Sequence, residues 1–401
     1  MWFHLFTGNH DEVGTITLYD MMEWLTAGLT ELNHEVTVGD TIAPNAINIV
    51  WENFCDNDVR IFEKHHFTFG LIATEIPTDH TFNWLPHNPW RTRRRCFDRI
   101  APRSAFIWSM MNEPMNLYRQ WAPAGLLEMG FSERILDDVF LEEPEFDFGF
   151  YGLSISPYRG QMLETLKAQC TITTPTRFLK GRELNKFIAS FRVGLCLKHM
   201  PNWPVSSPCR LSRLLHAKRG AAAEYVPIQT GPSAFVSMAA EDQDFASFCL
   251  DCVQGPWKQR AEDAYERFRA AMPMKTIMER LLDETVAMAS PSMNTLSPGD
   301  NGRRLRLTFG AATTRGSDSA DAHLASVPLD RIRRLTAELE QDGGNDDRAT
   351  TVSLLLNDYT TAVTHLRAVA RLAEDRIAAA AGPIRDASKL VRRALKSARN
   401  A

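Results

Sequence analysis

The sequence lacks the features of several large classes of protein. No apolar run in its 401 residues approaches the about 20 residues that cross a bilayer. The first residues, Met-Trp-Phe-His-Leu-Phe, lack the basic and apolar regions of a cleavable signal peptide. The seven cysteines are odd in number and have no framework spacing, which favours reduced thiols over disulfides. Together these absences predict a cytoplasmic protein.

Charge and short motifs exclude further classes. The net charge of −4 gives no overall attraction to nucleic acid or anionic membranes. The loop at 7–15 contains only Gly8 and Gly14, so the G-x-G-x-x-G dinucleotide fingerprint is absent. No Asp-x-Asp motif is placed to coordinate a metal. We therefore expect neither a bound cofactor nor a metal ion.

The most informative stretch of the chain is 146–225. It begins with an apolar run at 146–151, which predicts a strand, and Gly152 closes that run. A polar loop follows, and then a segment at 158–168 with apolar residues at helical spacing. A glycine allows a ligand to approach the backbone closely, and the unpaired N–H groups of a helix N-terminus suit an anion.

The same pattern recurs about 40 residues later. Residues 192–197 predict a buried strand, and a loop leads to Ser206-Ser207-Pro208-Cys209-Arg210. Ser207 is a favourable N-cap, and Pro208 suits the first helical position. Two such helix N-termini after parallel strands favour a phosphate-bearing ligand in the crevice between them. An ordinary α/β domain with serine caps and no nucleotide is the alternative.

This succession of elements resembles a known family. The chain resembles the C-terminal half of a GT-B glycosyltransferase, nearest to the group-1-like and CgeB-like branches. The order of elements that carries the resemblance is strand, Tyr-Gly, loop, Arg and helix, followed by strand, loop, Ser-Pro-x-Arg-Leu, helix, Gly and strand. The similarity is clearest over 146–285. It implies a domain that holds a nucleotide-diphosphate sugar. By this resemblance Gly152 and Arg159 lie near the diphosphate, and phosphate or ribose is cradled by Ser206, Ser207 and Arg210.

One position departs from that family. Many group-1 relatives have a glutamate three residues after the arginine of the second helix, near the ribose or the donor sugar. Here this place is occupied by Arg213. The resemblance then implies donor contacts that are rearranged around additional positive charge, or a different donor chemistry.

The N-terminal half predicts a βαβ unit. Strands are expected at 2–6, 35–38 and 47–51, with a long amphipathic helix after the first. The loop between that strand and helix resembles the GT-B loop in which acceptor and donor sugar meet. His10 is our first choice there for the base that takes the acceptor proton, and Asp11 is the second. The alternative is a turn in which His10 only faces water.

Acids follow two other expected strands of this half. The buried-type strand in 69–77 ends at Glu75, and Glu52 follows the strand at 47–51. Ligands bind at the carboxyl ends of parallel strands. Glu75 could therefore contact the acceptor or sugar hydroxyls as a catalytic-site residue, or it could cap a neighbouring turn, and the same alternatives apply to Glu52.

Two basic segments suggest further contacts. The arginine cluster at 91–95 could bind acceptor phosphates, a lipid headgroup or nucleic acid, or it could be a solvated helix face. Residues 384–399 predict a basic amphipathic helix that could touch anionic membrane or nucleic acid, or remain a solvated tail.

The whole chain predicts an α/β protein with two Rossmann-like domains facing a cleft, and a helical extension. We place an acceptor domain at 1–140, a nucleotide-sugar-binding domain at 146–286, a flexible linker at 287–327 and a helical tail at 328–401. Within the tail, 346–381 shows a heptad seam that could form a homodimer or pack within the chain.

The leading hypothesis is a metal-independent glycosyltransferase that uses a nucleotide-diphosphate sugar and an unidentified acceptor. Two alternatives stay open. One is a non-catalytic GT-B-like binding or assembly protein whose helical tail is its working part. The other is an enzyme that glycosylates nucleic acid and holds it through the basic segments, against which the acidic net charge weighs.

Overall fold

The computed structural model describes residues 1–10, 15, 17–65, 67–85, 88–135, 143–152 and 156–293. Asp11, the tail at 328–401 with its heptad seam at 346–381, and the basic terminus at 384–399 lie outside these residues. The two sheets of the described chain belong to one compact unit. No helix in the described part of the chain is long and apolar enough to cross a membrane.

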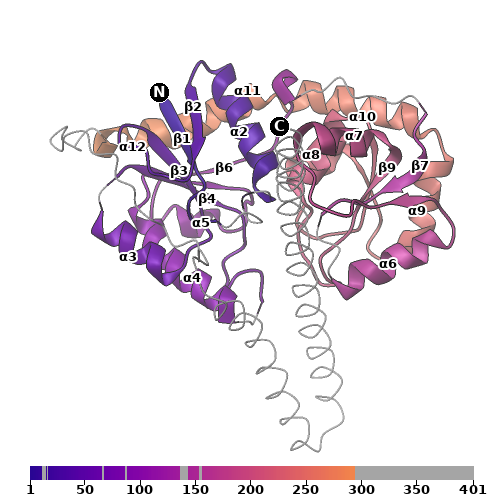
Figure 1. Ribbon diagram of the computed structural model, residues 1–401, viewed down its shortest axis with the longest axis horizontal. Helices are drawn as coiled ribbons and strands as arrows, with labels where there is room; N and C mark the ends of the chain where they lie inside the picture. The colour runs from indigo at the N-terminus through magenta and orange to yellow at the C-terminus, as the bar shows by residue number, and fades with distance from the viewer. Residues whose placement is uncertain are drawn as a thin grey trace, which may run out of the picture. The chain divides into compact units, whose positions relative to one another are not determined.

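The first half forms a parallel sheet whose strand order is β2-β1-β3-β4-β5-β6 (Figure 1). Its strands are β1 Trp2–Phe6, β2 Glu35–Gly39, β3 Ile47–Trp51, β4 Phe69–Ala73, β5 Phe106–Ser109 and β6 Ala124–Leu126. Its helices and 3₁₀ turns are α2 Tyr19–Glu31, α3 Asp56–Lys64, α4 Asn88–Ile100, η1 Ala101–Arg103, α5 Met115–Tyr118 and η2 Glu133–Ile135.

The second half forms another parallel sheet, in the order β11-β10-β9-β7-β8. Its strands are β7 Phe146–Gly149, β8 Ile172–Thr173, β9 Phe191–Cys196, β10 Gly220–Ala223 and β11 Ser237–Met238. The helices of this half are α6 Pro157–Lys167, α7 Gly181–Ala189, α8 Pro208–His216, η3 Gly231–Phe235, α9 Phe245–Gln254, α10 Trp257–Ala271, α11 Met274–Glu284 and α12 Val286–Met293. The predicted α/β fold with two parallel sheets is confirmed.

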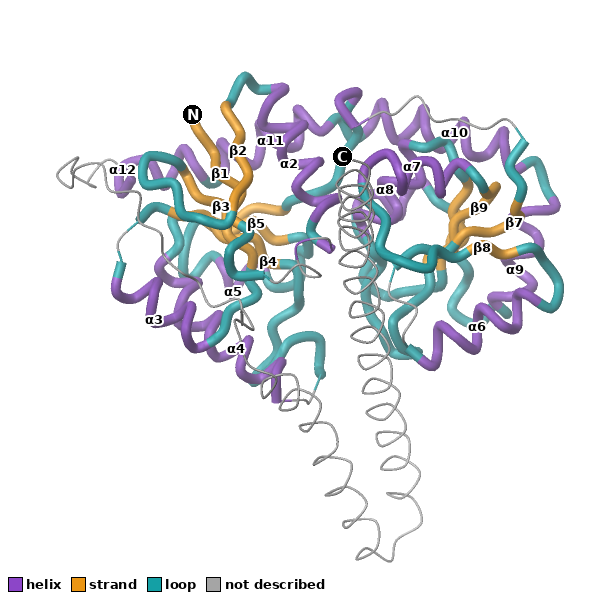
Figure 2. Tube along the Cα trace, in the orientation of Figure 1, coloured by secondary structure: helices purple, strands orange, loops and turns teal. Residues whose placement is uncertain are grey.

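Helices cover both faces of the first sheet (Figure 2), and the strands show why. Successive side chains of a strand point to opposite faces. In β3, Ile49 and Trp51 pack with α2 and α11, whereas Val50 between them packs with α3 and α4. A strand buried on both sides needs a continuous apolar run, as parallel sheets usually have.

The sequence also predicts strands at 224–226 and 233–237, and both predictions are wrong. Strand β10 ends at Ala223, Gly231–Phe235 form the 3₁₀ helix η3, and strand β11 covers only Ser237–Met238. Thr230 and Ser233 form a reciprocal capping box at the start of η3, and Pro232 lies in its first turn. These local cap signals outweigh the apolar run that follows.

The end of the described chain returns to the first sheet. Helix α11 packs against α2 with Met274 and Met278 next to Gly28, where an added Cβ would collide with both side chains. Beyond α11, the indole Nε1 of Trp108 donates to Oγ1 of Thr285 at 3.0 Å. The predicted domain boundaries remain predictions, but 274–285 contribute to the core of the first sheet.

Candidate functional site

Two arginines converge at the carboxyl ends of β7 and β9. These strands are parallel neighbours, and the chain after them enters α6 and α8 respectively. Arg159 lies in the first turn of α6, and Arg210 lies in the first turn of α8. Their guanidinium carbons lie 5.6 and 5.1 Å from the ring centre of Phe150, at the end of β7. The structure thus brings together two residues that the sequence assigned to one phosphate site.

Gly152 completes this arginine site. Its φ of +123° is a conformation that L side chains rarely adopt, and a Cβ there would collide with Nη2 of Arg210. Only glycine therefore allows the guanidinium to lie against this backbone. The sequence predicted that a ligand approaches the backbone at this glycine, whereas in the structure the group that approaches it is the side chain of Arg210.

The two arginines differ in how they are held. Arg159 donates from Nε to the carbonyl oxygen of Lys198 at 3.0 Å and from Nη2 to that of Leu197 at 3.1 Å. Nε of Arg210 is buried and has no hydrogen-bond partner in the described part of the chain. Burial and the nearby Arg210 charge lower the pKa of Arg159 to about 10. An anion between the two guanidinium groups would relieve this repulsion.

An acid that the sequence did not single out borders the arginine site. Glu224 follows β10 and is only 6% exposed. It accepts a hydrogen bond from the Tyr158 hydroxyl and another from the backbone N–H of Lys198, at 2.5 Å. Burial and this hydrogen bond to Glu224 raise the pKa of Tyr158. An acid directly after a third parallel strand was the available signal for Glu224.

The two serines before α8 have different surroundings. The buried hydroxyl of Ser206 lies 3.1 Å from Oγ1 of Thr230 and 2.8 Å from Oγ of Ser233, so it joins the loop to η3. Ser207 is exposed and is the N-cap of α8, as predicted, but its side chain makes no capping hydrogen bond. Of the two hydroxyls, only that of Ser207 is open to a ligand.

Arg213 lies in an ion-pair cluster between α8 and α2. Its side chain is 2% exposed, its Nη2 is 2.6 Å from Oδ1 of Asp20, and it also pairs with Glu23. The guanidinium lies 4.6 Å from the ring centre of Trp24. Burial acts to lower the pKa of Arg213, but the two carboxylates outweigh it and raise that pKa. The extra charge that the sequence assigned to the donor site is thus neutralised within the chain.

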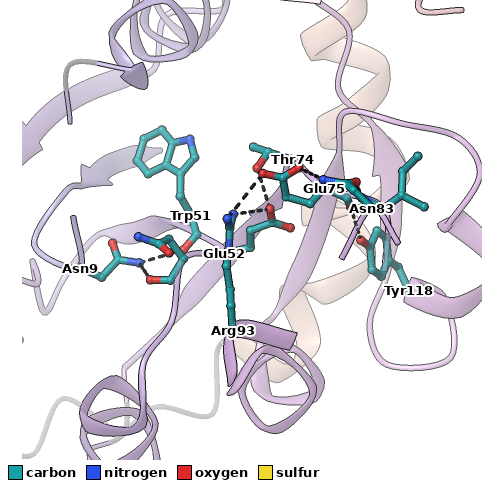
Figure 3. A network of polar contacts seen from close by, with 10 residues as sticks. Asn9, Trp51, Glu52, Thr74, Glu75, Asn83, Arg93 and Tyr118 are labelled. Carbon is teal, nitrogen blue, oxygen red and sulfur yellow. Dashed lines mark hydrogen bonds and ion pairs between the residues drawn. The ribbon is translucent and has the colours of Figure 1, made fainter. Parts of the chain in front are cut away.

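A second polar cluster lies at the carboxyl ends of β3 and β4 in the first sheet (Figure 3). Glu52 follows β3 and is fully buried, and its Oε1 accepts from Thr74 Oγ1 at 2.6 Å and from Arg93 Nη2 at 2.8 Å. Nη1 of Arg93 is 3.5 Å from Oε1 of Glu75, whose other oxygen accepts from Asn83. Two carboxyl groups therefore share one arginine.

The carboxyl group of Glu52 carries its proton unusually tightly. Burial raises its pKa to about 7, and the charge of Glu75 adds to this effect while that of Arg93 opposes it. Its Oε2 is buried and accepts no hydrogen bond in the described residues, so this oxygen is where a proton would sit. A buried acid with a pKa near neutral is typical of sites that hold or transfer protons.

The loop after β1 is fixed to the same edge of the sheet. Asn9 donates from Nδ2 to the carbonyl oxygens of Trp51 and Asn53 at 2.9 and 3.1 Å. Nδ1 of the partly exposed His10 lies 3.0 Å from Oδ1 of Asn9. The loops that carry His10 and Glu52 are therefore tied together.

The basic cluster at 91–95 forms part of α4 and is largely paired with acids. Arg93 contacts Glu52 and Glu75, Arg94 pairs with Asp98 at 3.0 Å, and Arg95 pairs with Asp56 at 2.9 Å. These pairs leave less positive charge available to a nucleic acid or a lipid headgroup than the sequence run suggests.

The described residues contain no group of three or more His, Cys, Asp or Glu side chains that could hold a metal ion. No protein-family model matches the chain, and no curated protein matches its sequence.

Several solved structures of glycosyltransferases are similar to the chain. AviGT4, a glycosyltransferase involved in Avilamycin A biosynthesis, is 12% identical with a TM-score of 0.42, over 73% of this chain and 98% of that one. A UDP-forming alpha,alpha-trehalose-phosphate synthase from Burkholderia vietnamiensis is 9% identical with a TM-score of 0.39, over 71% and 79%. The spinosyn rhamnosyltransferase SpnG, complexed with thymidine diphosphate, is 10% identical with a TM-score of 0.35, over 70% and 99%. Similarity of this degree identifies no activity for this chain.

Proposed function

We propose that this chain is a glycosyltransferase that binds a nucleotide-diphosphate sugar at the carboxyl ends of β7 and β9. The observation that carries the proposal is the convergence of Arg159 and Arg210 beside Gly152, where two helices begin. Guanidinium groups and exposed N–H groups at helix N-termini are suited to a diphosphate.

The arginine site would also act during the reaction. In sugar transfer the bond between the anomeric carbon and the diphosphate oxygen breaks, and the electron pair stays on the diphosphate. Arg159 and Arg210 would stabilise this leaving anion, in the role that a metal ion has in other enzymes. Ser207 would add a hydroxyl at the N-terminus of α8, where the structure leaves it exposed.

The acceptor would bind at the first sheet. If the reaction inverts the anomeric centre, His10 or Asp11 takes the proton from the acceptor hydroxyl as its oxygen attacks. The bonds of Asn9 to the chain after β3 would keep the His10 loop in place for this step.

Thermal unfolding in the presence of nucleotides tests donor binding. UDP, GDP, ADP, CMP and TDP are each added to the full chain. A ligand that binds only the folded state raises the melting temperature, by about 5 °C when its concentration is 100 times its Kd. If none of them raises it, the proposal loses its basis.

A pair of arginine variants locates the bound nucleotide. Arg210→Ala should abolish the shift, because it removes one of the two guanidinium groups. Arg192→Ala should preserve it, since Arg192 pairs with Asp147 near the opposite, amino end of β9. Equal shifts in both variants would place the diphosphate elsewhere.

Turnover separates an enzyme from a binding protein. The sugar form of whichever nucleotide shifts the melting temperature is incubated with the chain, and free nucleoside diphosphate is measured. Release above the rate without protein, lost in Arg210→Ala, supports catalysis. Binding without any release favours the non-catalytic alternative.

A further inference from the structure

Residues 74–85, which follow β4, form a hydrogen-bonded loop that carries Glu75. Pro77 and Phe82 form an antiparallel bridge within it. At its base, Asn83 donates from its backbone N–H to the carbonyl oxygen of Ile76 at 2.8 Å, and the N–H of Ile76 donates to Oδ1 of Asn83 at 2.9 Å. The loop therefore has a defined conformation at the carboxyl edge of the first sheet.

This conformation includes two consecutive residues in the left-handed region. Asn83 has a φ of 52° and Trp84 a φ of 59°. Asparagine tolerates this region, but for a residue as bulky as tryptophan it is unfavourable. Such strain persists only where surrounding bonds enforce it, and it is common at ligand-binding sites.

The strained tryptophan is also exposed. The Trp84 side chain is 60% exposed, although tryptophan is usually among the more buried residue types. It follows Asn83 directly, and Asn83 donates a hydrogen bond to the carboxylate of Glu75. An apolar ring and a carboxylate are thus carried by the same hydrogen-bonded loop.

Arg93 completes the group from α4. Its guanidinium lies 5.0 Å from the ring centre of Trp90 and 5.5 Å from that of Phe82, so two aromatic rings hold it. The side chains of Arg93 and Glu75 are 18% and 20% exposed, whereas Glu52 behind them is fully buried. A ligand in solution can therefore reach Glu75 and Arg93. The buried ion pair with Glu52 holds Arg93 in position.

The charges of this group indicate the class of ligand. Arg93 balances Glu75, and burial raises the pKa of Glu52 to about 7, so Glu52 is mostly protonated below pH 7. Burial also raises the pKa of Tyr118, which interacts with Glu52, so its hydroxyl stays neutral. The group as a whole then has little net charge below pH 7. A neutral ligand fits it better than an ion, and a hydroxyl group can donate to Glu75 while it accepts from Arg93.

We infer that Trp84, Glu75 and Arg93 form a binding site for a neutral carbohydrate ring. The indole of Trp84 packs against the C–H face of the ring, and one ring hydroxyl bonds to Glu75 and Arg93. The inference rests on the proposed function in one respect, namely that the sugar bound here is the acceptor of the transfer.

Saturation-transfer NMR on the full chain tests the carbohydrate site without any nucleotide. The probes are the methyl glycosides of glucose, mannose, galactose and rhamnose, with glucosamine and glucose 6-phosphate as charged counterparts. We expect transfer to the ring protons of at least one neutral glycoside. The Kd of that glycoside should increase about tenfold in both Trp84→Ala and Glu75→Gln.

Phe178→Ala is the matched control, because Phe178 is another exposed aromatic residue, at 37%, in the part of the chain that forms the second sheet. It should leave glycoside binding unchanged. Melting temperatures of all three variants verify that they fold. The inference is overturned if no neutral glycoside binds, if only the charged sugars bind, or if Trp84→Ala binds as tightly as the unaltered chain.

The failure of this inference and that of the proposed function differ in outcome. If glycoside binding depends on Trp84 but no nucleotide raises the melting temperature, the carbohydrate site is supported and the proposed glycosyltransferase function is contradicted. If a nucleotide binds but no glycoside does, the proposed function is supported and the carbohydrate site is contradicted.

Discussion

The carboxyl edges of the two sheets have the same backbone arrangement and opposite chemistry. At the first sheet, Glu52 and Glu75 surround a single arginine. At the second, Arg159 and Arg210 surround the ring of Phe150, and the nearby Glu224 accepts hydrogen bonds from Tyr158 and Lys198. Both clusters lie where parallel strands end and helices or loops begin.

This difference shows what is general and what is particular in such a fold. Parallel strands place loop residues and helix N-termini at one edge, so the position of a site follows from topology. The ligand follows from the side chains, since carboxyl groups suit hydroxyls and protons whereas guanidinium groups suit phosphates. Arg213 links the two halves through α2 and α8, and the largest predicted effect concerns this link.

Arg213→Ala should destabilise the chain by about 3 kcal/mol, because it leaves Asp20 and Glu23 without their buried partner and opens space beside Trp24. Urea unfolding measures the change. Arg280→Ala is the control, because Arg280 pairs with Glu128 at 3.0 Å with its side chain 48% exposed, and its loss should cost less than about 1 kcal/mol. Equal losses in the two variants would show that the buried cluster contributes no more than a surface pair.

Glu52 should make the chain less stable as the pH rises, and this tests the acidic half of the comparison. Its pKa is about 7 when folded against 4.5 as the ordinary value, so the folded state holds the proton more tightly. The resulting stability is fully present below pH 4.5 and is lost as the pH rises through 7, by about 3 kcal/mol in total.

Glu52→Gln cannot ionise, so its free energy of unfolding should lack this decline between pH 5 and 8. Urea titrations at pH 5 and at pH 8 measure the free energy of unfolding. Glu63→Gln, in an exposed pair with Arg99, should retain the decline. A decline in Glu52→Gln as steep as in the unaltered chain would mean that Glu52 is ionised throughout this range.

Most of the first sheet could be predicted from its sequence because its strands are continuous apolar runs. β1 and β3 have the predicted bounds, and the long amphipathic helix predicted after the first strand is α2. Helix α7 was not predicted, because its apolar positions are few and its first residue, Gly181, is not a typical helix start. The strand assigned at 233–237 was wrong because a Thr-Gly-Pro-Ser cap signal preceded it.

The candidate sites were predictable where a residue type and a strand end coincide. Gly152, Arg159, Arg210, Glu52 and Glu75 satisfy this condition, and the structure groups them into two clusters. The partners of Arg213 could not be predicted, because Asp20 and Glu23 lie about 190 residues away in sequence. The exposure of Trp84 could not be predicted either, because it depends on the hydrogen bonds of the loop that precedes it.

Gly152→Ala tests whether the arginine site requires a residue without a side chain at position 152. The new Cβ would meet Nη2 of Arg210, and the φ of +123° is unfavourable for alanine, so we expect a loss of about 1–3 kcal/mol and no nucleotide-induced rise in melting temperature. Gly160→Ala is the matched control, because Gly160 lies within α6 and an added Cβ there has no atom within 4 Å. It should raise stability by about 0.5–1 kcal/mol and preserve nucleotide binding. If both variants bind nucleotide equally, the close approach at Gly152 serves the fold alone.

The adjacent serines 206 and 207 provide the finest test, since they should divide stability from binding. The buried hydroxyl of Ser206 bonds to Thr230 and Ser233, so Ser206→Ala should lower the free energy of unfolding by about 1 kcal/mol and leave the nucleotide Kd unchanged. The hydroxyl of Ser207 is exposed and makes no capping bond, so Ser207→Ala should keep the stability and weaken nucleotide binding a few-fold. Urea unfolding and nucleotide titration on both variants measure the two quantities. The reverse result would mean that the diphosphate reaches the interior of the loop before α8, and that Ser206 rather than Ser207 contacts it.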